Sequence, residues 1–88
     1  DVYKRQPKLL EEIAKAIAGG NVVQVTRAAH TLKGSSLTLG AVNLSNFCKE
    51  LEILSREGNT EESSQKLPLI KAEYERVKAA LQIKRHDG

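Results

Sequence analysis

The chain has 88 residues and a net charge of +3, from 14 basic and 11 acidic side chains, which leaves room for one small domain. Aromatic residues are only 3% of the chain and tryptophan is absent, so a nucleic-acid surface made of a basic stripe and aromatic stacking platforms is not expected. No apolar run approaches the roughly 20 residues of a membrane span and no signal peptide is visible, so we expect a cytoplasmic protein that does not bind a membrane.

The first predicted helix begins at Pro7, a residue that suits the first helical position, and runs to about Ala18. Residues 1–6 show no clear periodicity, so we interpret them as a linker or a leader that is foreign to the domain. Gly19 and Gly20 end the helix, because glycine accepts the left-handed turn that closes one. The apolar stripe of this helix comprises Leu9, Leu10, Ile13, Ala14 and Ile17.

A second helix is predicted from Val22 to about Leu39, with Asn21 as its N-cap and Gln24 as the capping-box partner. Gly40 closes this helix as glycine closes the first. The core stripe again follows a spacing of three and four positions, typical of one helix face: Val22, Val25, Ala29, Leu32, Ser36 and Leu39.

A third helix is predicted from about Val42 to Glu57. Its apolar stripe comprises Leu44, Phe47, Cys48, Leu51 and Leu54. Cys48 is the only cysteine, which excludes a disulfide within the chain. Its place in the stripe predicts a buried structural thiol rather than a reactive one.

The fourth helix follows Gly58 and Asn59, and we expect Thr60 to cap it. Pro68 predicts a kink or a short break, with a fresh helix start at that point as the alternative. The apolar stripe comprises Leu67, Ile70, Tyr74, Val77 and Leu81.

These segments predict an all-α fold, because no strand pattern or hairpin dipeptide competes with them. Short connections between amphipathic helices favour antiparallel neighbours, so we expect an antiparallel up-and-down four-helix bundle. Residues 7–85 would form the domain and 86–88 a tail, with fraying expected from Lys84 onward.

His30 does not belong to the core stripe of the second helix. At roughly 100° per residue it lies about 140° from the centre of the stripe, which predicts an exposed side chain in mid-helix. Thr26 and Lys33 lie on one flank of it, and Arg27 and Gly34 lie on the other.

The surroundings of His30 indicate a site open to another molecule. Gly34 within a helix costs about 1 kcal/mol relative to alanine, and a missing side chain there would let a partner approach the imidazole. Val23 and Leu37 are apolar residues on the same face, which is typical of a docking surface.

The chemistry that fits these residues is phosphoryl transfer. An unperturbed imidazole is partly unprotonated near neutral pH and is then a nucleophile, and Lys33 could neutralise phosphate charge. The sequence has no carboxylate cluster for Mg²⁺ and no nucleotide-binding loop, so these must come from elsewhere.

The segment AAHTLKGSSLTLG, residues 28–40, resembles the signature of histidine phosphotransfer (HPt) domains of two-component phosphorelay signalling. The family pattern is His-x-Leu-Lys-Gly, a second glycine followed by a small residue, and a downstream Leu-Glu. It matches His30, Leu32, Lys33, Gly34, Gly40, Ala41, Leu51 and Glu52.

The resemblance implies that His30 accepts a phosphoryl group from an aspartyl phosphate and passes it on. Both the donor and the acceptor would be receiver domains, in a response regulator or a hybrid histidine kinase. The receiver would supply Mg²⁺, so no cofactor and no autonomous kinase activity are expected of this chain. The resemblance also implies that Glu52 accepts a hydrogen bond from the other ring nitrogen of His30 and leaves Nε2 as the nucleophile.

We expect a monomer whose partner surface includes Val23, Arg27 and Leu37. The alternative is a helical interaction or dimerisation module without phosphotransfer. An enzyme with its own active site is disfavoured, because no metal cluster, catalytic triad or phosphate loop is present. A kinase dimerisation domain would usually place an acidic residue after the histidine, where this chain has Thr31. His86 lies in a charged segment without such a context.

Overall fold

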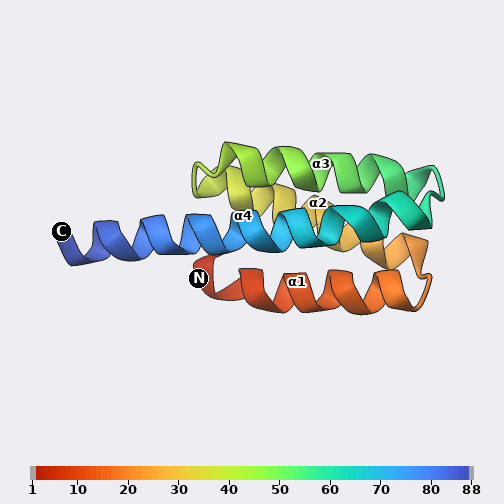
Figure 1. The fold of residues 1–88 in the computed structure, drawn as a ribbon, viewed down its shortest axis with the longest axis horizontal. Coiled ribbons are helices and arrows are strands. Elements are labelled where there is room, and N and C mark those ends of the chain that lie inside the picture. Colours follow the sequence, from red (N-terminus) through yellow and green to blue (C-terminus); the bar gives the residue numbers. More distant parts are fainter. Residues whose placement is uncertain (1, 88) are drawn as a thin grey trace.

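The computed structural model describes the backbone of residues 2–87 and the side-chain environments of residues 8–80. Within that part of the chain there are four helices and no strand: α1 (Val2–Ala18), α2 (Val22–Thr38), α3 (Val42–Arg56) and α4 (Thr60–Asp87). Each helix runs antiparallel to the next, and α1 and α4 close the bundle (Figure 1). The predicted all-α, up-and-down four-helix bundle is confirmed.

The three links between helices share one construction. Each has three residues, 19–21, 39–41 and 57–59, and its middle residue is a glycine with φ of 68° at Gly20 and 76° at Gly40 and Gly58. That conformation reverses the chain at a low steric cost only for glycine. The predicted cap of α2 is confirmed, since Asn21 Oδ1 accepts from the Gln24 amide at 3.1 Å.

The cap of α4 differs from the prediction. The Asn59 side chain accepts from the Glu62 amide at 3.1 Å, whereas Thr60 is already the first helical residue. Asn59 occupies the third position of its link, as Asn21 does in the first. The identical link length therefore determines which residue caps the helix.

The core is aliphatic and follows the predicted stripes. Side chains from all four helices are buried in it, namely Leu9, Leu10, Ile13, Ala16, Val25, Ala28, Ala29, Leu32, Leu44, Cys48, Leu51, Ile70 and Tyr74. Ala16 is buried where Ala14 was expected, and Phe47 and Leu54 are only half-buried. The Cys48 thiol is fully buried, as predicted, and burial raises its pKa to about 12 against an opposing effect of the Lys33 charge.

Two helices are longer than predicted. The helix α1 begins at Val2 and continues through Pro7, which costs it one backbone hydrogen bond. The helix α4 runs through Pro68 to Asp87, so the predicted break or fresh start is wrong, and the helix includes residues 84–87, where fraying was expected. Ser63 before Pro68 and Ile70 after it are both buried, so packing on either side holds the helix together. The side chains of Leu81 and His86 lie outside the described residues.

The division into a leader, a domain and a tail stays a prediction. The C-terminal part of α4 extends past the other three helices (Figure 1). Over the described residues, no helix combines the length and the apolarity that crossing a bilayer requires.

Candidate functional site

The helix α2 presents His30 to solvent, as the helical periodicity of the sequence predicted. The side chain of His30 is 66% exposed, while its neighbours Ala29 and Leu32 are fully buried. Val23 and Leu37 on the same helix are 66% and 57% exposed. The buried stripe therefore anchors α2 and leaves the imidazole accessible from outside.

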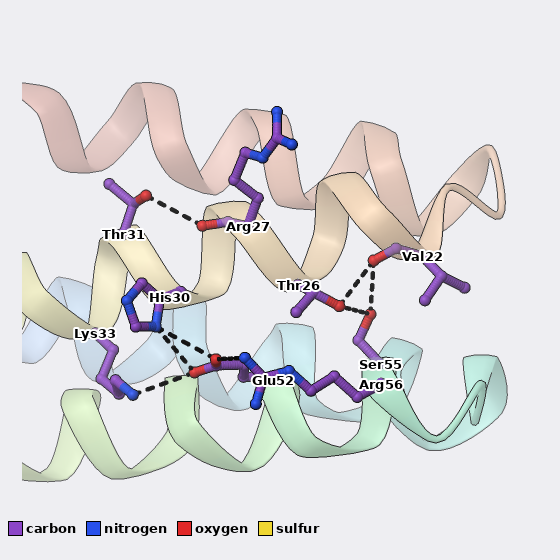
Figure 2. A network of polar contacts seen from close by, with 9 residues as sticks. All are labelled: Val22, Thr26, Arg27, His30, Thr31, Lys33, Glu52, Ser55 and Arg56. Atoms are coloured by element: carbon purple, nitrogen blue, oxygen red, sulfur yellow. Dashed lines mark hydrogen bonds and ion pairs between the residues drawn. The ribbon is translucent and has the colours of Figure 1, made fainter.

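The carboxylate of Glu52 on α3 lies against the inner side of the imidazole (Figure 2). Its two oxygens are 3.3 and 3.4 Å from Nδ1 of His30, and its side chain is only 6% exposed. The other ring nitrogen points away from Glu52 (Figure 2). The structure thus brings together the two residues that the resemblance paired.

Two cations hold the same carboxylate from opposite sides (Figure 2). Lys33 Nζ lies 3.2 Å from Oε1, and Arg56 Nη2 lies 2.7 Å from Oε2. Sequence reasoning missed Arg56. The sequence feature that could have identified Arg56 is its position four residues after Glu52, which places both side chains on one face of α3.

Burial alone would raise the pKa of the Glu52 carboxyl. Hydrogen bonds from Lys33 and His30, together with the charges of Lys33 and Arg56, outweigh that effect and hold the pKa below its ordinary value. Glu52 is therefore ionised near neutral pH and can only accept hydrogen bonds. A neutral imidazole that faces it favours the proton on Nδ1, which leaves the lone pair on Nε2.

Gly34 lies one turn after His30 on the exposed side of α2. Apart from the adjacent residues and the backbone of its own helix, a Cβ added there would meet no described atom within 4 Å. The position is therefore free of internal packing, and its glycine is not explained by the fold of this domain.

A hydroxyl network joins α2 to α3 one turn before His30 (Figure 2). The Ser55 hydroxyl donates to the carbonyl oxygen of Val22 at 3.0 Å, and the Thr26 hydroxyl lies 2.9 Å from Ser55 Oγ. Ser55 is buried, and the sequence reading did not single it out. These bonds fix the register of the two helices that carry His30 and Glu52.

A shallow groove of about 520 Å³ lies beside the imidazole. It is lined by Val22, Val23, Thr26, Arg27, His30, Thr31, Glu52 and Arg56. Val23 and Arg27 of the predicted partner surface therefore border one hollow, whereas Leu37 lies outside it.

No group of three or more histidine, cysteine or acidic side chains could hold a metal ion among the described residues. The expectation that Mg²⁺ belongs to the partner stays a prediction.

Among protein families, the Hpt domain matches this chain over residues 3–80. The match spans α2 and α3 with all of the residues described above. The comparison with curated proteins gave no match, and neither did the comparison with solved structures.

Proposed function

This chain belongs to the Hpt domain family, whose members act in phosphorelays with receiver domains, and on that premise we propose that His30 is its phosphoryl carrier. It accepts the group from the aspartyl phosphate of one receiver and returns it to the aspartate of another. The chain is then a carrier with no kinase activity of its own. The same proposal holds that the protein is cytoplasmic and monomeric and that it binds no nucleic acid.

The transfer needs a lone pair on Nε2 of His30. Nε2 attacks phosphorus, the bond from phosphorus to the aspartyl oxygen breaks, and the aspartate leaves with that electron pair as a carboxylate. The imidazole keeps its Nδ1 proton and becomes a phosphorylated imidazolium, whose positive charge faces the carboxylate of Glu52. The return step reverses each of these changes, with Mg²⁺ bound by the receiver.

Two further residues have roles in this proposal. Lys33 lies one turn from His30 with its side chain 26% exposed, so it can turn toward an incoming phosphoryl group and neutralise its charge. Gly34 leaves open the space that an approaching receiver would occupy. Val23 and Arg27 border the groove beside the imidazole, and Arg27 would attract an acidic partner surface.

The observation that carries the proposal is the contact between Nδ1 and a buried, ionised carboxylate. An imidazole exposed only for docking would need no such partner. The contact supports Nε2 as the nucleophile and gives the phosphorylated ring a counter-charge.

The test is incubation with a receiver phosphorylated at its aspartate. Wild type should take up acid-labile phosphate, and phosphorus NMR should place it on Nε2. His30→Gln should take up none, whereas His86→Gln, which removes the other histidine, should match wild type. If several receivers fail to label wild type, the carrier function is wrong and a docking module is the better interpretation. Equal labelling of His30→Gln would refute the site.

A further inference from the structure

The carboxylate of Glu52 has two cationic partners, although one would suffice to neutralise it. Lys33 approaches Oε1 at 3.2 Å, and Arg56 approaches Oε2 at 2.7 Å. Nδ1 of His30 is nearly equidistant from both oxygens. The orientation of the carboxylate toward the ring therefore depends on a balance between the two cations.

A phosphoryl group on Nε2 would compete with Glu52 for the ammonium group of Lys33, which lies 3.2 Å from Oε1. A phosphoryl group brings about two negative charges, which would draw the ammonium away from the carboxylate. Glu52 is almost fully buried, and a buried carboxylate that loses its cation pays a large desolvation penalty. Without a second cation, Lys33 would stay with Glu52.

We propose that Arg56 is a positioning residue: it holds the Glu52 carboxylate against Nδ1 of His30 and so releases Lys33 to the phosphoryl group. This inference rests on the proposed carrier function. Arg56 suits the role because its guanidinium is always charged and because it lies on the same helix as Glu52, one turn later. Its contact is also the shortest of those made to Glu52 in the described chain.

Under this proposal Arg56 contributes to the chemistry of the site and little to the stability of the fold. Its side chain is 65% exposed and returns to water at little cost, and Lys33 still neutralises Glu52 when Arg56 is removed. Arg56→Ala should therefore fold normally. Arg76 is a matched control, since it is 68% exposed and lies 2.7 Å from Glu73 on α4, away from the site.

The first measurement needs no phosphate. Nitrogen NMR of the His30 ring reports which nitrogen carries the proton in the neutral form. Arg56→Ala should lower the fraction with the proton on Nδ1, Arg56→Lys should restore part of it, and Arg76→Ala should leave it unchanged. An unchanged tautomer in Arg56→Ala would overturn the proposal.

The second measurement is a double-mutant cycle on the rate of transfer from a phosphorylated receiver. If Arg56 frees Lys33, then Lys33→Ala costs less in the Arg56→Ala background than in wild type, with a coupling of about 3-fold or more. Lys33→Ala combined with Arg76→Ala should be multiplicative. Multiplicative rates for Lys33→Ala with Arg56→Ala would show that Arg56 acts independently, for example by steering the partner, and would overturn the release of Lys33.

The two failures are distinguishable. If no receiver labels wild type, the carrier function fails, and the tautomer alone decides whether Arg56 positions Glu52. If wild type is labelled but Arg56→Ala leaves the tautomer unchanged or shows no coupling to Lys33, the function stands and the proposed role of Arg56 is refuted.

Discussion

Replacing Glu52 by glutamine tests the chemistry of the site with the smallest change in shape. Glutamine keeps an oxygen that can accept from Nδ1 of His30, but it removes the charge that faces the ring, Lys33 and Arg56. Its amide nitrogen can also donate to Nδ1, which would favour the unreactive tautomer. We therefore expect slower transfer in a domain that remains folded.

The expected rate follows from the contact geometry. A hydrogen bond to an ionised group contributes about 1.5–3 kcal/mol, against about 1 kcal/mol for a neutral one. The distances of 3.3 and 3.4 Å from Nδ1 to the carboxylate are long for a charge-assisted bond, which is typically about 2.7–2.9 Å. The low end of the difference, about 0.5 kcal/mol, predicts transfer that is about 2-fold slower, or about 10-fold if receiver docking tightens the contact.

The expected change in stability is smaller. His30 and Arg56 are mostly exposed and return to water when the carboxylate charge is lost, so the 3–5 kcal/mol typical of breaking a fully buried ion pair does not apply. Glutamine also avoids the cost of burying a charge. We expect Glu52→Gln to lower the free energy of unfolding by less than about 1 kcal/mol.

Acid titration provides an independent check of this reasoning. Because the folded pKa of Glu52 lies below its ordinary value, the folded chain binds fewer protons than the unfolded chain between the two pKa values. The stability that Glu52 contributes is therefore complete above the ordinary glutamate pKa of about 4.3 and is lost as the pH falls through the folded pKa. Glu52→Gln should flatten this part of the curve.

The assays are the rate of phosphoryl transfer from a labelled receiver and denaturant unfolding across the acid range. Unchanged transfer in Glu52→Gln would refute the role of the carboxylate. A decrease of 3 kcal/mol or more in the free energy of unfolding at neutral pH would refute the argument that His30 and Arg56 return to water when the charge is removed. An unchanged acid limb would refute the depressed pKa.

Four other outcomes are expected. Gly34→Gln should raise the free energy of unfolding by up to about 1 kcal/mol, because nothing packs there, and yet slow transfer; unimpaired transfer would refute its role in access. Lys33→Ala should slow transfer with helicity unchanged by circular dichroism, and a loss of helicity would make the lysine structural. Cys48 should react with thiol reagents only through unfolding, since its pKa is about 12; rapid labelling in native buffer would contradict its burial. Leu51→Ala removes a fully buried side chain and should cost about 2–5 kcal/mol, measured by urea denaturation.

Features that local sequence determines were predictable. The glycines of the links impose a left-handed turn whatever packs around them, and Asn21 caps α2 through an amide three residues away. The exposure of His30 followed from helical periodicity, because the stripe beside it had to face the core. These arguments needed no knowledge of which helices are neighbours.

Features that depend on packing were not predictable in the same way. Pro68 weakens a helix locally, yet buried residues on both sides keep α4 continuous. Thr60 and Asn59 are both residue types that cap helices well. The three-residue link places Asn59 at the cap position, and residue type alone could not predict this. Ser55 bonds to α2, and Arg56 holds a carboxylate that faces His30 on α2. The sequence of α3 alone does not reveal that α2 packs against these residues.

The site therefore depends on the register of two helices rather than on a pocket. His30 and Glu52 are 22 positions apart, and their contact requires α2 and α3 to pack without sliding. The hydroxyl network of Thr26 and Ser55 provides that constraint one turn away, on the opposite side of the imidazole from Lys33 (Figure 2). An imidazole that is held on one side in this way stays exposed on the other, and the proposed carrier function requires that exposure, because one atom has to meet two different partners.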